Sequence, residues 1–302
     1  MVDMIISERV RDAIEDGRPV VALESTIFSN LGLPSPANEE ALTRTLAAVR
    51  DGGAEPAVTA IMDGTVRVGL DDRDHERILG EASKTAERDI PAATSQVWSV
   101  GATTVSASLA ICARAGISVF ATGGIGGVHH GASETGDVSA DLGAIARHPV
   151  LTVAAGAKAF LDISRTLEHL ETLSVPVIGY RTDEFPMFYA RSSGLPVPLR
   201  LDTPGDVARL LRDRITWAAG GALLAVPVPE ANALSSDEIQ TGMSDALDAA
   251  KRLGIRGAAV TPFVLGEISK ALDGNNIPAN LALSENNARV AAQVAVAFAE
   301  LG

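Results

Sequence analysis

Short apolar runs alternate with amphipathic stretches along nearly the whole chain. The apolar runs predict buried strands at residues 19–24, 117–122, 150–155, 175–180 and 222–226. Apolar positions at helical spacing predict helices near residues 38–49, 104–115, 158–172, 204–217, 236–253, 262–272 and 284–300. Asn38 is a candidate N-cap for the first of these helices. Strands that alternate with helices are typical of an α/β domain with a largely parallel sheet.

One local signal indicates that the sheet is mixed. Asp63-Gly64 separates two β-rich runs at 57–62 and 65–70, and this dipeptide favours a tight hairpin between antiparallel strands. No linker, internal repeat or change of composition divides the chain. We therefore predict a single domain over residues 1–302 with three α/β/α layers.

Composition limits the kinds of partner. The 302 residues carry a formal net charge of −13, which argues against nonspecific binding to nucleic acid or to an anionic membrane. A local cluster of cations can still bind an anionic ligand. The single cysteine, Cys112, lies in an apolar run, so we expect it in the core with no intrachain disulfide. The chain shows neither a signal-peptide pattern nor an apolar run of membrane length, and we expect a cytoplasmic protein.

One lysine interrupts a neutral apolar run at the end of a predicted strand. In Val150-Leu-Thr-Val-Ala-Ala-Gly-Ala-Lys158-Ala, Lys158 follows a glycine where the chain turns into the next predicted helix. Burial disfavours an ammonium ion, so an amine in apolar surroundings can lose its proton and attack a carbonyl-like carbon. The alternative is an exposed lysine in the first helical turn, and the local pattern does not decide between the two.

Two other predicted strands end in polar or glycine-rich segments, where open α/β sheets bind ligands. Glu24 ends the run 19–24, and a carboxyl group there tends to have a raised pKa and to donate a proton, unless it caps a helix or forms an ion pair. The loop Gly123-Gly-Ile-Gly-Gly-Val-His-His-Gly131 matches neither a dinucleotide fingerprint nor a P-loop. We expect a binding loop, with plain loop geometry as the alternative.

Two carboxylates lie four residues apart in Asp137-Val-Ser139-Ala-Asp141. Oxygen ligands suit a hard cation such as Mg²⁺ or Mn²⁺, and the chain has no HExxH motif or Cys/His cluster typical of zinc sites. The alternative is that Asp137 or Ser139 caps a helix that runs towards Arg147. Both interpretations can hold for different residues.

Together, in order, these segments resemble the pseudouridine-5′-phosphate glycosidase family, which includes indigoidine-synthase-A-like proteins. The most specific matching strings are Val119-Phe-Ala-Thr-Gly-Gly-Ile-Gly-Gly-Val-His129 and Ala155-Gly-Ala-Lys158. Further matching stretches lie at residues 22–26, 56–64, 101–105, 137–142, 170–180, 182–186, 261–263 and 286–288. The resemblance spans nearly the whole chain.

The resemblance implies reversible cleavage of the C–C glycosidic bond of pseudouridine 5′-phosphate to uracil and ribose 5-phosphate. It also implies a Mn²⁺-type cation and a homotrimer with an α/β/α fold. By matching motif positions, Lys158 would be the nucleophile, Glu24 the proton donor and Asp137 the metal ligand. The residues that would line the substrate site are Lys84, Val105, Ser139, Ala140, Asp141 and Asn280.

A C-glycoside lacks the bridging oxygen that ordinary glycosidases protonate. The resemblance therefore implies another route, in which Glu24 protonates the ring oxygen O4′ and the amine of Lys158 adds to C1′. Protonation of uracil at C5 then releases the base and leaves a lysine imine, which water hydrolyses.

Some positions depart from the family's usual residues. His130 and Glu87 replace arginines, Pro278 replaces a lysine and Val226 replaces an asparagine. The catalytic glutamate, lysine and aspartate positions are retained. Two other functions stay open: a Schiff-base lyase or aldolase that acts on another sugar phosphate, and a catalytically silent sugar-phosphate sensor.

Overall fold

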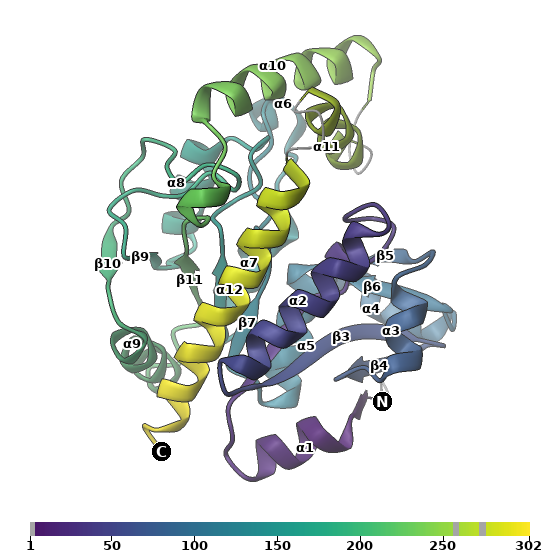
Figure 1. Cartoon of the computed structure of the whole chain (residues 1–302), viewed down its shortest axis with the longest axis vertical. Helices are drawn as coiled ribbons and strands as arrows, with labels where there is room; N and C mark the ends of the chain where they lie inside the picture. The colour runs from purple at the N-terminus through teal and green to yellow at the C-terminus, as the bar shows by residue number, and fades with distance from the viewer. Residues whose placement is uncertain (1–3, 256–259, 272–275) are drawn as a thin grey trace.

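A mixed sheet runs through the molecule with helices on both faces (Figure 1). The computed structural model describes residues 4–255, 260–271 and 276–302. In this part of the chain the strand order is β1-β4-β3-β2-β7-β8-β11-β9-β10, with β6 paired to β3 and β5 to β6. The strands are β1 (Met4–Ile6), β2 (Val20–Leu23), β3 (Glu55–Met62), β4 (Thr65–Val68), β5 (Ser83–Thr85), β6 (Val100–Thr103), β7 (Val119–Ala121), β8 (Leu151–Ala154), β9 (Val177–Tyr180), β10 (Leu199–Leu201) and β11 (Ala222–Ala225).

Most neighbouring strands are parallel. The strands from β3 through β2, β7, β8, β11 and β9 to β10 share one direction, whereas β4 and β6 lie antiparallel to β3. The hairpin expected at Asp63-Gly64 joins β3 to β4, with Met62 opposite Thr65. The prediction of a mixed, largely parallel sheet is confirmed.

The helices form the two outer layers. Their bounds are α1 (Glu8–Glu15), α2 (Ala37–Asp51), α3 (Asp72–Ile78), α4 (Ile90–Ser95), α5 (Val105–Ala115), α6 (Ala132–Thr135), α7 (Ala140–Arg147), α8 (Ile163–Thr172), α9 (Pro204–Thr216), α10 (Ser236–Arg252), α11 (Val260–Ala271) and α12 (Asn276–Ala299). None of these described helices combines the length and the apolarity that crossing a membrane requires.

Different helices cover the two faces of the sheet. Val21 and Leu23 of β2 belong to a core cluster that includes residues of α2, α9 and α12, while Val20 and Ala22 belong to a second cluster that includes residues of α1, α5, α7 and α8. Neighbouring side chains of a strand point to opposite faces, so burial on both faces explains the continuous apolar runs in the sequence. Helices α2 and α12 lie side by side across one face (Figure 1). The three-layer α/β/α prediction is confirmed.

Most predicted elements are present. The five apolar runs form β2, β7, β8, β9 and β11, and Cys112 is buried in α5 as expected. The helix predicted near 262–272 is α11, although residue 272 lies outside the described residues. The prediction of a single domain over residues 1–302 stays a prediction.

Helix starts were predicted less accurately than the strands. Asn38 is not an N-cap, because α2 already begins at Ala37 and the buried Asn38 amide donates hydrogen bonds to the carbonyls of Phe28 and Leu79. The helix predicted to start near residue 284 begins at Asn276. Its first turns contain a proline and two asparagines, and tertiary packing buries both asparagines, which overrides local propensity.

Candidate active site

The candidate site lies where neighbouring parallel strands end. β2, β7 and β8 are adjacent in the sheet and run in the same direction, so their carboxyl ends lie at one edge. Glu24 follows β2, Thr122 follows β7, and Lys158 lies a few residues beyond β8. This edge is where open α/β sheets place their ligands.

Glu24 is a buried carboxyl group, with 7% of its surface exposed. Burial raises its pKa, and the nearby carboxylate of Asp141 adds to that effect. The charges of Lys158 and Lys84 and a short hydrogen bond donated by the Thr122 hydroxyl act in the opposite direction. Because burial dominates, Glu24 keeps its proton to a higher pH than a free carboxyl group does, as expected from the sequence, and the group is suited to donate a proton.

Lys158 lies in an extended segment and not in a helix. The chain beyond β8 continues to pair with the glycine-rich loop, and the Lys158 N–H donates to the Ile125 carbonyl at 3.1 Å. Helix α8 begins only at Ile163, after its N-cap Asp162. The helix predicted over 158–172 is therefore wrong in its first residues. The half-buried Lys158 is held by the backbone of the loop beside it.

Gly156 makes the turn that leads to Lys158. Its φ is +74°, and a Cβ there would lie 2.1 Å from the Pro186 carbonyl oxygen. We expect Gly156→Ala to destabilise the fold by at least about 2 kcal/mol more than Gly116→Ala, because φ is also positive (+76°) at Gly116 but the space around it is open. Urea unfolding of both variants measures the difference, and equal losses would contradict this account of the turn.

An antiparallel strand brings the start of α5 to the same place. Leu23, the last residue of β2, pairs with Val58, but β3 continues to Met62. β6 pairs with this extension and runs back along it. Its last residue, Thr103, donates its N–H to Ser25 Oγ at 2.8 Å, directly after Glu24 in the chain.

Lys84 and Val105 both reach the site through β6. Val105 is the first residue of α5, and Lys84 lies on β5, which pairs with β6. Although Lys84 is solvent-exposed, its surroundings desolvate the ammonium enough to lower its pKa, and the charge of Lys158 lowers it further. The carboxylates of Asp141 and Glu24 oppose this shift. These mutual influences show that the charged site residues lie close together.

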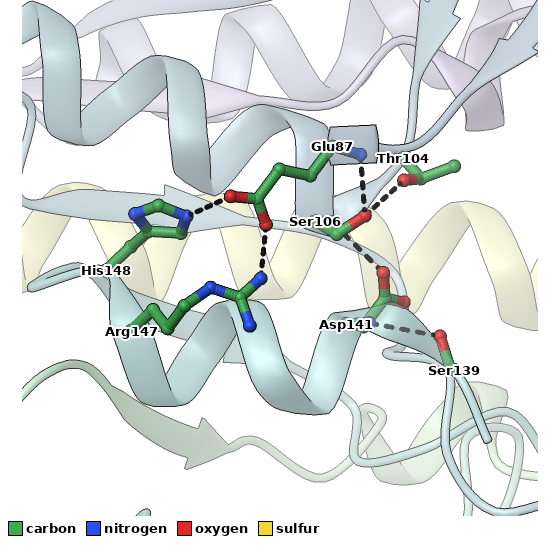
Figure 2. A network of polar contacts seen from close by, with 7 residues as sticks. All are labelled: Glu87, Thr104, Ser106, Ser139, Asp141, Arg147 and His148. Carbon is green, nitrogen blue, oxygen red and sulfur yellow. Dashed lines mark hydrogen bonds and ion pairs between the residues drawn. The ribbon is translucent and has the colours of Figure 1, made fainter. Parts of the chain in front are cut away.

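Asp141 ties the glycine-rich loop to two helices. Its Oδ1 accepts the Ser106 N–H at 3.0 Å and its Oδ2 accepts the Gly126 N–H at 2.9 Å. Ser139 is the N-cap of α7, directly before Ala140, and accepts the Asp141 N–H, as Figure 2 shows. The capping alternative is thus confirmed for Ser139. A Cβ on Gly126 would lie 2.3 Å from Ser139 Oγ, so this glycine permits close packing within the protein.

We expect Asp141→Asn to reduce the free energy of unfolding by about 1–3 kcal/mol. An amide keeps one acceptor, but its NH₂ group would face a main-chain N–H that has lost its partner. Asp137→Asn is the matched control, since the Asp137 side chain is 37% exposed, and we expect a change within about 0.5 kcal/mol. Urea unfolding measures both. Similar stabilities for the two variants would show that the contacts of Asp141 do not support the fold.

Glu87 joins the other end of α7 to this network (Figure 2). Its carboxylate contacts Arg147 Nη2 at 2.5 Å and His148 Nε2 at 3.0 Å, and its N–H donates to Ser106 Oγ at 3.2 Å. Glu87, which replaces an arginine of the family pattern, is therefore paired with Arg147 of α7. It holds the segment after Lys84 against α7.

Asp137 lies beside His129 of the glycine-rich loop. Its Oδ2 is 3.9 Å from His129 Nδ1, and burial lowers the pKa of His129 although the charge of Asp137 raises it. Among the described residues, no group of three or more His, Cys, Asp or Glu side chains could hold a metal ion. A single half-exposed carboxylate fits a hydrated hard cation, which keeps several water ligands, and does not fit a closed metal site.

Asn280 forms part of a buried polar wall on α12. Its Nδ2 lies 3.4 Å from the hydroxyl of Tyr189, while its Oδ1 has no hydrogen-bond partner among the described residues. The residue before Tyr189, Phe188, donates its N–H to the Ala155 carbonyl in the segment that leads to Lys158. Asn280 therefore offers a free amide acceptor near this segment.

Comparison with known proteins places the chain in a family. The family model described as "Indigoidine synthase A like protein" matches residues 9–297. The chain belongs to the indigoidine synthase A-like family. It is 50% identical over 292 residues to a protein of Methylobacterium nodulans named pseudouridine-5′-phosphate glycosidase, covering 96% of this chain and 86% of that protein. A Myxococcus xanthus protein of the same name is 48% identical over 302 residues, covering 99% of each.

Solved structures of similar proteins have the same fold. The crystal structure of the prealnumycin C-glycosynthase AlnA in complex with ribulose 5-phosphate matches with a TM-score of 0.92 and 35% identity, covering 99% of this chain and 98% of that one. An indigoidine synthase A-like protein from Thermotoga maritima matches with a TM-score of 0.88 and 34% identity, covering 99% and 97%. The α/β fold is thus that of other solved structures, one of them named as an indigoidine synthase A-like protein.

The other departures from the indigoidine synthase A-like pattern have simple structural settings. His130 is exposed, and Val226 is buried in the core with its N–H donated to the Ala154 carbonyl. Pro278 lies in the first turn of α12, where a main-chain N–H has no helical partner to lose.

Sequence reasoning missed two contributors to the site. Thr122, the last residue of a predicted strand, hydrogen-bonds to Glu24, and the half-buried His129 lies 3.9 Å from Asp137 and is influenced by the charges of both lysines. The position of Thr122, directly before the glycine-rich loop, was the signal in the sequence that could have identified it as a site residue. The position of His129 depends on pairing of the loop with residues 138 and 161, which no local pattern reveals.

Proposed function

We propose that the chain reversibly cleaves the C–C glycosidic bond of pseudouridine 5′-phosphate, releasing uracil and ribose 5-phosphate. The observation that carries the proposal is the placement of Glu24, whose pKa is raised by burial, close to the half-buried residue Lys158. The relatives named for this activity support the substrate, as does the C-glycosynthase solved with a sugar phosphate.

The reaction uses the two groups in sequence. Glu24 donates its proton to O4′ as the ribose ring opens, and Lys158 Nζ adds to C1′. A proton delivered to uracil C5 allows the C1′–C5 bond to break. Its electron pair restores the C5=C6 double bond of the departing uracil, and the lone pair of the lysine nitrogen forms the C1′=N bond of the imine. Water adds to the imine and returns the free amine with ribose 5-phosphate.

The remaining site residues bind the two halves of the substrate. Lys84 supplies a positive charge for the phosphate, and Val105 is the first residue of α5, whose amino end favours an anion. Ser139, Ala140 and Asp141 line the sugar side. The free Oδ1 of Asn280 is suited to accept an N–H from the uracil ring.

A Mn²⁺-type cation at Asp137 is part of the proposal. Bound there with water ligands, it would stabilise negative charge on the uracil carbonyls. We expect dialysis against EDTA to lower activity and Mn²⁺ to restore it, with Asp137→Asn requiring at least about tenfold more Mn²⁺. Calorimetric titration measures the affinity of the same site for Mn²⁺ without turnover. Equal Mn²⁺ affinity of wild type and Asp137→Asn would exclude Asp137 as the ligand.

We also propose a cytoplasmic homotrimer that uses neither nucleic acid nor membrane as a partner. The net charge of −13 supports the absence of a nucleic-acid or membrane partner, the unpaired Cys112 supports a reducing compartment, and the homotrimer is what the family resemblance implies. Light scattering after size-exclusion chromatography tests it by giving the mass of the assembly.

The decisive assay measures release of uracil from pseudouridine 5′-phosphate in the presence of Mn²⁺. Turnover that yields uracil and ribose 5-phosphate supports the proposal. Cleavage of another sugar phosphate without uracil release favours a Schiff-base lyase or aldolase. Measurable ligand binding with no turnover favours a sugar-phosphate sensor.

A further inference from the structure

A small cavity lies behind Glu24, on the side of the sheet covered by α2 and α12. The space open to the centre of a water molecule measures about 10 Å³, close to what one water needs. The lysines and the Ser139–Asp141 segment are not part of its lining. The residues that line the cavity are Leu23, Glu24, Ile27, Phe28, Thr45, Ala121, Thr122, Gly123 and Ser284.

Two hydroxyl groups of the lining lack partners. Thr45 of α2 is 3% exposed and Ser284 of α12 is 5% exposed, and neither hydroxyl oxygen has a hydrogen-bond partner among the described residues. Serine and threonine inside helices often bond to a preceding main-chain carbonyl, but these two do not. A buried polar group without a partner is costly, so two such groups beside one polar cavity indicate a bound water.

Glu24 lines the cavity, and one of its two carboxyl oxygens has no hydrogen-bond partner among the described residues. Within the described residues, Thr122 is the group that hydrogen-bonds to its carboxyl, through Oε1. A carboxyl group that exchanges a proton with a substrate needs a partner for its second oxygen in both protonation states. A water molecule can serve both states, because it accepts from the acid and donates to the carboxylate.

The walls of the cavity are held rigidly. Arg44 and Glu285, the neighbours of Thr45 and Ser284 in the chain, form an ion pair of 2.7 Å between α2 and α12. Asn287 of α12 donates hydrogen bonds to the carbonyls of Thr122 and Gly123 at 2.8 and 3.2 Å. The two hydroxyls are therefore fixed relative to the strand end that carries Glu24.

We propose that one ordered water occupies this cavity and bridges the Glu24 carboxyl to the hydroxyls of Thr45 and Ser284, which makes these two residues positioning residues for the proton donor. The inference rests on the proposed role of Glu24. The charged groups that act on Glu24 are Lys158, Lys84 and Asp141. Its hydrogen-bond partner Thr122 is neutral, and so are the two hydroxyls behind it.

The double variant Thr45→Val, Ser284→Ala tests the bridge, because both changes nearly preserve shape and remove the hydroxyls. Without the water, the Glu24 carboxylate loses solvation, so the pH at which activity falls as Glu24 ionises should rise by about one unit. We expect kcat to fall about tenfold with KM unchanged, because neither residue contacts the substrate. Thr152→Val is the matched control: Thr152 is a buried hydroxyl without a partner among the described residues, but it lies on β8 outside the cavity.

Infrared difference spectra against Glu24→Gln follow the titration of Glu24 without turnover, so they separate failure of this inference from failure of the proposed function. A shift of the Glu24 titration in the double variant, but not in Thr152→Val, supports the bridge whatever the substrate is. An unshifted titration overturns it. If the double variant does not fold, Ser284→Ala alone and a high-resolution crystal structure decide: a water within hydrogen-bond distance of Glu24, Thr45 and Ser284 supports the bridge, and an empty cavity overturns it.

Discussion

Lys158→Ala is expected to reduce uracil release from pseudouridine 5′-phosphate by about 10⁴-fold or more. The C–C bond breaks only after C1′ has a covalent partner that can hold the positive charge as an imine, and the structure places one half-buried amine at the end of β8, beside Glu24. Stopped assays of uracil release measure the effect.

Two variants control this experiment. Lys158→Arg keeps a positive charge but carries no nucleophilic amine at neutral pH, so it should be as inactive as Lys158→Ala. Lys251→Ala removes an exposed lysine of α10 and should leave activity unchanged. Substantial turnover by Lys158→Arg would mean that charge, and not covalent attachment, is what Lys158 supplies.

Glu24→Gln is expected to reduce the same activity by about 10²- to 10⁴-fold, because the amide has no acidic proton for O4′. In the wild type, burial raises the pKa of Glu24, so the acid form persists above the usual range for a carboxyl group. Activity should fall as pH rises through this raised pKa. Rates of the wild type and of Glu24→Gln across the pH range measure this fall in activity. If Glu24→Gln shows the same fall, the proton donor is another group.

The same substitution should stabilise the fold at neutral pH. The folded protein binds the Glu24 proton more tightly than the unfolded chain does, so stability declines as pH rises from the unfolded pKa towards the raised folded value. Above that window the full cost of burying a carboxylate is present, and glutamine removes it. Thermal unfolding should therefore show a higher midpoint for Glu24→Gln at pH 7 and no difference below the unfolded pKa. A lower midpoint at pH 7 would contradict the burial argument.

Strands buried on both faces were predictable from sequence because they read as continuous apolar runs. The run at 150–155 became β8, and the Asp63-Gly64 dipeptide identified a hairpin because its turn geometry is local. Short elements such as β5 and β6 were not predicted. They are three and four residues long, and they form only through tertiary pairing, β6 with the far end of β3 and β5 with β6.

The candidate residues were predictable mainly from the family resemblance, and their surroundings were not. Burial of Glu24 followed from its apolar strand, but its bond to Thr122 depends on the order of β2 and β7 in the sheet. The helix expected at Lys158 is absent because the backbone there pairs with Ile125, a contact between segments more than thirty residues apart. Asp141 lies close to the charged site residues, yet each of its carboxylate oxygens accepts a hydrogen bond from a main-chain N–H group.

The central claim is that Lys158 forms an imine with C1′ of ribose 5-phosphate. Incubation of the protein with ribose 5-phosphate and sodium borohydride, followed by peptide mass spectrometry, tests it most directly. The account predicts one reduced ribose-phosphate adduct on the peptide that contains Lys158, and none in Lys158→Ala. Efficient uracil release by a wild-type protein that yields no adduct, or an adduct on Lys84 instead, would contradict it.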